Sequence, residues 1–170
     1  MKNYGAKLDK IREMFPDKTI EEAIRIDESY YKAFPGVKAY HNYCWLRARE
    51  FSYTENLFGV KYYGLNGHKL INTLIQGTAA YFLKWKMRQA YDFCKEKGLK
   101  TKYQMNIHDE LSWLYHRQDP LNIFFEFKGL MEYWEDSYVP IVADMEITTT
   151  TWKDKKEVST LHELQENLST

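Results

Sequence analysis

The chain has 170 residues, which is enough for one domain with its own core or for a large part of a bigger protein. Its 24 basic and 24 acidic side chains cancel, so net charge neither favours nor excludes a polyanionic partner. We expect no membrane contact, because the sequence has no secretory segment and no apolar run long enough to cross a bilayer.

Two further features of the composition bear on the setting and the surface of the protein. The two cysteines, Cys44 and Cys94, have neither metal-type nor redox-type spacing, which favours a reduced, cytoplasmic environment. Aromatic residues make up 16% of the chain, and the sequence has 14 tyrosines. A small core does not need so many, so we expect tyrosines at surfaces, grooves or interfaces.

Helical patterns dominate the start of the chain. Apolar side chains recur at helical spacing in three successive segments, residues 2–15, 17–34 and 37–50. Asp17 or Thr19 can cap the second helix, whose first turn then carries Glu21 and Glu22. The Phe-Pro-Gly sequence at residues 34–36 is expected to separate the second helix from the third.

A hairpin and a long helix are predicted next. Residues 51–63 alternate around the sequence TENLFG, which predicts two short strands joined by a turn. Asn66 and Gly67 are expected to form a loop before the longest helix, residues 68–97, whose apolar positions keep the helical period. Gly98 is well placed to end this helix.

The sequence YQMNIHDELSWLY, residues 103–115, is the most informative stretch of the chain. Apolar and polar residues alternate on both sides of a central His-Asp-Glu, which predicts two strands that meet in a tight turn. Carboxylates at the tip of a packed hairpin are held rigidly and can converge on a hard cation such as Mg²⁺. The alternative is that Asp109 and Glu110 only form a solvated turn.

The remaining residues predict a helix, a strand and a tail. Asp119 and Pro120 begin a helix over residues 121–138, and β-branched residues predict a strand over residues 141–152. Residues 153–170 are charged and poor in apolar side chains, so we expect a partly disordered tail. The predicted fold class is α+β, with a small antiparallel sheet packed against several helices that include one long helix.

Several stretches, in order along the chain, resemble the C-terminal part of family A DNA polymerases, the DNA polymerase I group, and most closely its phage members. The sequence INTLIQGTAA resembles the long palm helix, and NIHDEL resembles the third polymerase motif. The sequences YKAFPGVKAY and TENLFG resemble connecting segments, and MKNYG resembles the end of the second motif on the fingers helix. The QGTAA helix followed by His-Asp-Glu is the most specific signal.

The resemblance implies a catalytic hairpin. In this family two Mg²⁺ ions, held by carboxylates, activate the primer 3′-hydroxyl and stabilise the leaving pyrophosphate. Asp109 corresponds to a catalytic, metal-binding carboxylate, and Glu110 beside it to a supporting catalytic group. His108 resembles the residue that approaches the primer terminus, and the alternative for it is a histidine that packs the turn.

The resemblance also implies contacts with nucleic acid and nucleotide. Asn72 and Gln76, one helical turn apart, resemble the pair that contacts the minor groove near the new base pair, and Asn106 extends this polar row. The alternative for Asn72 and Gln76 is a solvated helix face. His68 stands where family members carry a DNA-contacting arginine, and Tyr4 lies in the nucleotide-binding motif.

Departures from the family pattern are informative. The first motif, with the other metal-binding Asp, and the arginine and lysine that grip the triphosphate would lie upstream of the asparagine-tyrosine-glycine stretch. Lys2 is too close to Tyr4 to be that lysine, Leu8 replaces a second tyrosine, and Tyr81 replaces a common Asp. We therefore expect the last part of a polymerase: a helical segment at residues 1–50, a palm sub-domain at 51–152 and a charged tail at 153–170.

Three functions are consistent with the sequence, and we rank them in this order. The first is a split or truncated DNA polymerase, inactive alone and located in the cytoplasm, of the bacterial host if phage-encoded. Its partners would be DNA primer–template, dNTP and a second polypeptide that carries the missing motifs. The second is a non-catalytic relic that binds nucleic acid or a replication protein. The third is a small metal-dependent hydrolase built on His108, Asp109 and Glu110. It would need more ligands, and the other histidines show no metal-type spacing among themselves: His41, His68, His116 and His162.

Overall fold

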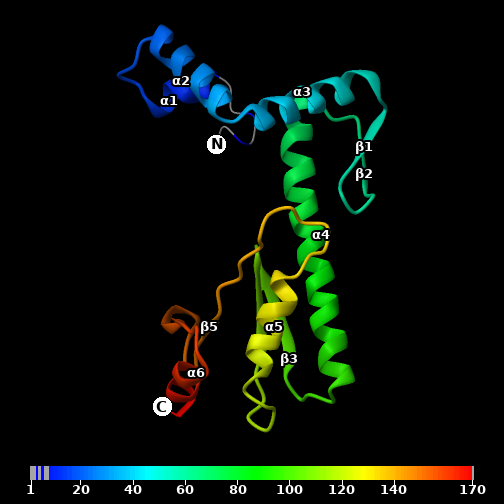
Figure 1. The fold of residues 1–170 in the computed structure, drawn as a ribbon, viewed down its shortest axis with the longest axis vertical. Coiled ribbons are helices and arrows are strands. Elements are labelled where there is room, and N and C mark those ends of the chain that lie inside the picture. Colours follow the sequence, from blue (N-terminus) through cyan, green and yellow to red (C-terminus); the bar gives the residue numbers. More distant parts are fainter. Residues whose placement is uncertain (1–2, 4, 6–7, 170) are drawn as a thin grey trace. The chain divides into compact units, whose positions relative to one another are not determined.

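The chain divides into two compact units, Met1–Tyr81 and Phe82–Thr170. The structure is a computed structural model that describes residues 3, 5 and 8–169 (Figure 1). The long helix α4 (Gly67–Glu96) contributes residues to both units. Among the described residues, no helix is both long and apolar enough to cross a membrane.

The first unit begins with three helices, and the sequence explains where the second and the third of them start. They are α1 (Leu8–Met14), α2 (Ile20–Ala33) and α3 (Pro35–Glu50). Thr19, one of the two predicted N-caps, begins α2 in a capping box: its hydroxyl accepts from the Glu22 N–H, and the Glu22 carboxylate accepts from the Thr19 N–H. α3 begins at Pro35, two residues earlier than predicted, because proline at the first helical position has no N–H to leave unpaired.

The predicted hairpin forms between β1 (Tyr53–Glu55) and β2 (Lys61–Tyr63). Asn56 closes the turn, since its side-chain oxygen accepts from the N–H groups of Phe58 and Val60 at 3.0 Å each. Its amide nitrogen donates to the Tyr62 hydroxyl at 3.3 Å. A β-carbon added to Gly77 would lie 2.2 Å from that hydroxyl, so Gly77 allows Tyr62 to pack closely on α4.

The start of α4 differs from the prediction, because Gly67 is the first residue of the helix and does not belong to a loop. The Asn66 side chain accepts from the Lys69 N–H at 2.9 Å and caps the helix. A β-carbon on Gly67 would come within 2.4 Å of the Trp45 ring, so glycine lets α3 and α4 approach. The core of this unit consists of Cys44, Leu70, Ile71 and Leu74.

In the second unit α4 ends as predicted. Gly98 adopts a left-handed conformation with φ of +65°, and the Leu99 N–H bonds to the Cys94 carbonyl at 2.9 Å, which completes a Schellman motif. The hairpin of β3 (Lys102–Ile107) and β4 (Glu110–Leu114) follows, and α5 (Ile123–Glu132) lies beside it (Figure 1). The buried core joins α4 to α5 through Ala90, Cys94, Ile123 and Phe127.

The hairpin carries an irregularity that alternation did not predict. Its register shifts between Tyr103 and Met105, so that Tyr103 pairs with Trp113 and Met105 pairs with Ser112. Such a bulge strengthens the local twist and changes which residues share a face. The predicted alternation of Tyr103, Met105 and Ile107 is therefore interrupted after its first member.

Two predicted elements are shorter than expected. α5 covers residues 123–132 and not 121–138, and the expected strand at 141–152 is reduced to β5 (Glu146–Ile147). β5 pairs only with the two residues of β6 (Lys156–Glu157), which limits its length. Asp119 does not begin the helix; its carboxylate instead accepts from the N–H groups of Lys100 and Thr101.

The predicted disorder of the tail is wrong. The segment contains a 3₁₀ turn, η2 (Trp152–Asp154), then β6 and the helix α6 (Leu161–Ser169). Val158 and Leu164 are only 2% and 0% exposed, and Thr160 and Glu163 form a capping box at the start of α6. The fold class is confirmed as α+β: helices, one of them long, with small antiparallel sheets, which here are three separate two-stranded ladders in the described part of the chain.

Candidate functional site

The tip of the β3–β4 hairpin is a two-residue turn. Ile107 pairs with Glu110, which leaves His108 and Asp109 between the strands. His108 has φ of +53°, a left-handed conformation that is uncommon for a residue other than glycine. His108 and Asp109 are exposed, and Glu110 is half-buried. The Asp109 carboxylate thus faces solvent in a short turn whose backbone is fixed by the pairing of Ile107 with Glu110.

The hairpin that carries this tip is anchored by aromatic packing. The Trp113 ring stacks on Phe127 of α5 with centroids 4.9 Å apart, and it meets Tyr103 edge-on at 5.4 Å. Tyr115 packs on Phe124 at 5.0 Å. These contacts pack β4 and the residue Tyr115 that follows it against α5, and Tyr103 joins β3 to β4. The tip is therefore supported by a packed element and not by a loose loop.

Glu110 is engaged by a residue that the sequence analysis missed. The Lys155 ammonium lies 2.8 Å from Glu110 Oε1 and 2.5 Å from Glu146 Oε2, and it stands 4.3 Å from the centre of the Trp152 ring. Hydrogen bonds to these two carboxylates raise the pKa of Lys155 above its usual value. No periodicity connects residues so far apart, and Lys155 lay in the segment predicted to be a disordered tail.

Asp109 differs from Glu110 in its partners. Within residues 3, 5 and 8–169 its carboxylate makes no hydrogen bond or ion pair, and no group of three or more His, Cys, Asp or Glu side chains could hold a metal ion. A single exposed carboxylate suits a hard cation such as Mg²⁺, which keeps several waters and completes its shell with substrate oxygens. Asp109 therefore fits as one ligand of such an ion.

Asn106 lies four residues from Glu110 on the opposite strand of the same hairpin. Its side chain is exposed, and its oxygen accepts from the Tyr103 hydroxyl at 3.3 Å. The structure thus brings together Asn106, His108, Asp109 and Glu110 in the second unit.

The other predicted DNA-contacting residues, His68, Asn72 and Gln76, lie on α4 in the first unit. Gln76 is exposed, whereas Asn72 is half-buried. The oxygen of the Asn72 amide is buried and has no hydrogen-bond partner in the part of the chain that is described. An unpaired buried acceptor carries a free-energy cost.

The predicted nucleotide-binding residue, Tyr4, lies outside the described residues. Its neighbour Asn3 is described and is anchored. The His41 Nε2 atom lies 3.0 Å from the Asn3 carbonyl oxygen, and the Tyr30 hydroxyl donates to the Asn3 side chain. His41 is buried, and its Nδ1 atom lies 3.0 Å from the Tyr31 hydroxyl. No local pattern in the sequence predicted these contacts of His41.

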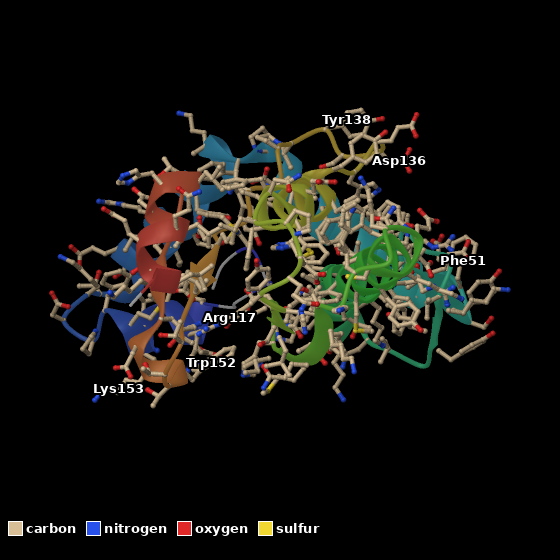
Figure 2. All side chains as sticks on the ribbon, turned by 90° about the horizontal axis from the view of Figure 1, so that it is seen from below. Phe51, Arg117, Asp136, Tyr138, Trp152 and Lys153 are labelled. Carbon is tan, nitrogen blue, oxygen red and sulfur yellow. The ribbon has the colours of Figure 1, made fainter. Side chains whose placement is uncertain are left out.

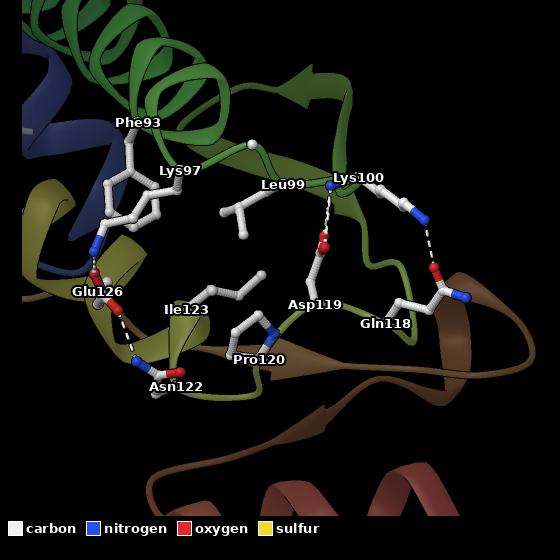
Figure 3. A pocket seen from close by; sticks show the side chains of 11 residues that line it. Phe93, Lys97, Leu99, Lys100, Gln118, Asp119, Pro120, Asn122, Ile123 and Glu126 are labelled. Atoms are coloured by element: carbon white, nitrogen blue, oxygen red, sulfur yellow. Dashed lines mark hydrogen bonds and ion pairs between the residues drawn. The ribbon is translucent and has the colours of Figure 1, made fainter.

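A pocket of about 430 Å³ lies at the base of the hairpin (Figure 3). Asp119 faces the backbone of Lys100 there, and Lys97 pairs with Glu126 at 3.5 Å. The six residues of β3 separate this pocket from the hairpin tip by roughly 20 Å at the usual rise per residue. Its polar groups bond to one another, so we interpret the pocket as a structural joint between α4, β3 and α5.

Comparison with known proteins gives a consistent result. Residues 3–154 match DNA polymerase family A. The chain is 29% identical over 148 residues to DNA polymerase I of Streptococcus pneumoniae, covering 80% of this chain and 17% of that protein. It is 31% identical over 95 residues to DNA polymerase DpoZ of Salmonella phage PMBT28, covering 54% of this chain and 15% of that protein.

A solved structure shows the same fold. The polymerase domain of Pol1 from M. smegmatis, determined in complex with DNA primer-template and dNTP, superposes with a TM-score of 0.66 at 24% identity. The match covers 76% of this chain and 24% of that one. The chain thus spans less than a quarter of the length of each of these relatives. Because the family match includes most of its residues, the chain belongs to DNA polymerase family A.

Proposed function

We propose that the chain is a palm fragment or subunit of a DNA-directed DNA polymerase, together with the end of the fingers, and acts in DNA replication. The observation that carries this proposal is the packed hairpin that presents Asp109, exposed and without a described partner, inside a family A region. In this proposal residues 51–152 are the palm, preceded by the helical segment 1–50 and followed by the tail 153–170.

The proposed role of the hairpin is to hold one metal-binding carboxylate. When bound, two Mg²⁺ ions would lower the pKa of the primer 3′-hydroxyl and neutralise the leaving pyrophosphate. Asp109 would supply one carboxylate to them, and Glu110, tied to Lys155, would support the tip. His108 at the turn would approach the primer terminus.

The proposed role of α4 is to contact the minor groove of the primer–template. Asn72 and Gln76 carry amides that can both donate and accept, which suits the acceptor groups that every base pair presents there. In this role their side-chain NH2 groups would donate to those acceptors. Asn106 and His68 would add further polar contacts, and Tyr4 would contact the incoming dNTP.

We also propose that a second polypeptide completes the enzyme. Asp109 is one carboxylate where two-metal chemistry needs more. Several large apolar side chains on the first unit are exposed, and such a partner would cover them: Phe34, Trp45, Phe51, which is labelled in Figure 2, and Tyr63. The isolated chain would then be inactive, and a complete enzyme would work in the cytoplasm.

A second candidate function is a non-catalytic module that binds nucleic acid or a replication protein. Its specific support is that the described residues offer no cluster of metal ligands. Primer extension distinguishes the two candidates. It is measured with the chain alone and with the chain mixed with a polypeptide that carries the first motif and the upstream fingers. Template-directed synthesis by the mixture alone supports the polymerase, and no synthesis by either supports the binding module.

A further inference from the structure

Lys155 is the only described cation within ion-pair distance of the hairpin tip, and it joins two carboxylates that are distant in sequence. Glu110 begins β4, and Glu146 begins β5. The Lys155 side chain is only 18% exposed, whereas the carboxylates are 39% and 40% exposed. The covered member of this triad is therefore the cation, which distinguishes it from an ordinary pair of solvated surface charges.

The position of Lys155 in the chain is also informative. The match to the polymerase family ends at residue 154, so Lys155 is the first residue beyond it. The residues that follow Lys155 form regular structure: β6 pairs with β5, and Val158 and Leu164 are buried. Lys155 thus connects a segment outside the family match to the hairpin inside it.

We propose that Lys155 is a positioning residue that holds Glu110 in an ion pair and keeps it from acting as a ligand of the metal ion at the hairpin tip. The inference rests on the proposed role of Asp109 as a metal ligand. It deepens that role, because it gives a physical reason why two adjacent carboxylates would behave differently.

Electrostatics supports this reading. The Lys155 ammonium, 2.8 Å from Glu110 Oε1, offsets part of the Glu110 charge, since it is shared with Glu146, and its positive charge opposes the approach of a divalent cation to that oxygen. The pairing also fixes the rotamer of Glu110, because Lys155 is itself held by Glu146 and by the Trp152 ring. Asp109 has no such countercharge among the residues described and stays open to a cation.

The test is a titration of the whole chain with Mn²⁺, in which the electron paramagnetic resonance signal reports free ion. Wild type is expected to bind weakly. Lys155→Met should bind about tenfold more tightly, because Glu110 then adds an anionic oxygen and the repelling charge is gone. Adding Glu110→Gln to Lys155→Met should return the affinity to the wild-type value, and Lys155→Arg, which keeps the charge, should match wild type.

Other variants keep the inference falsifiable if Lys155→Met loosens the fold. Glu110→Gln in the otherwise wild-type chain should weaken Mn²⁺ binding only slightly, because Lys155 stays paired with Glu146, and a loss as large as that of Asp109→Asn would overturn the inference. Unchanged affinity in Lys155→Met would overturn it as well. Asp109→Asn reports separately on the proposed function: wild-type Mn²⁺ affinity in this variant would contradict the metal role of Asp109 but would not alter the comparison at Lys155.

Discussion

The Asp119 carboxylate accepts two hydrogen bonds from Thr101, one from its backbone N–H at 2.6 Å and one from its hydroxyl at 2.7 Å. The Lys100 N–H donates to the same carboxylate at 2.9 Å. These bonds connect the start of β3 to the segment that leads into α5. They place a buried charge beneath the hairpin whose tip carries Asp109.

This relationship predicts a pH dependence of stability. Burial alone would raise the pKa of Asp119, but the hydrogen bonds from Thr101 and Lys100 outweigh it and lower the pKa below the usual value. Because the folded-state pKa is the lower one, the stabilisation is present above about pH 4 and is lost as pH falls through the folded-state value. Urea unfolding of wild type and Asp119→Asn between pH 2 and 7 measures how the free energy of unfolding falls with pH. An equally steep fall in the variant would exclude Asp119 as the source of the pH dependence.

Gly77→Ala should destabilise the first unit. The new β-carbon would lie 2.2 Å from the Tyr62 hydroxyl, so Tyr62 must move away from α4 and lose its bond from Asn56. We expect a loss of about 1–3 kcal/mol in the free energy of unfolding, and a smaller loss when Tyr62→Phe removes the hydroxyl. Gly129→Ala in α5 is the matched control, because nothing lies within 4 Å of its β-carbon and alanine should stabilise that helix.

Leu164→Ala should release the C-terminal helix. Leu164 is fully buried, and α6 has few other apolar contacts that could replace it. The expected cost is about 2–5 kcal/mol, with faster hydrogen exchange confined to residues 145–169. Leu161→Ala, at a position that is 45% exposed, should have little effect. Equal exchange in both variants would show that the segment does not depend on this core.

Gln76→Ala should weaken synthesis by the completed enzyme without abolishing it. The side chain is exposed on α4, so its removal should not disturb the fold. We expect the loss of one hydrogen bond to DNA, which is worth roughly 1–3 kcal/mol in primer–template affinity. Fluorescence anisotropy with labelled primer–template measures this loss, and unchanged affinity would remove Gln76 from the interface.

The most accurate predictions from the sequence concern elements that are specified by residues close together in the chain. The apolar period and Gly98 placed the two ends of α4 each within one residue, because spacing and capping are properties of short stretches. The strand expected at residues 141–152 was overestimated, since β propensity is expressed only where a partner strand is available. The order of α6 was missed because a capping box and two buried apolar residues outweigh a charged composition.

Contacts between distant residues could not be predicted in the same way. Lys155 meets Glu110 across 45 positions, and His41 meets Asn3 across 38. Neither contact can be predicted from a periodic pattern in the sequence, because each depends on the tertiary packing of separate elements. The resemblance to a family supplied the candidate residues, and the structure supplied the partners that separate Asp109 from Glu110.

The most direct test of the account compares Asp109→Asn with Glu110→Gln in primer extension, with each variant mixed with a polypeptide that carries the missing motifs. Both changes keep the size of the side chain and remove one charge. Asp109→Asn should lower the rate on the order of a thousandfold or more while assembly stays intact, because a metal-binding charge is lost. Glu110→Gln should be clearly milder. Robust extension by the Asp109→Asn mixture, or by the wild-type chain without a partner, would contradict the account.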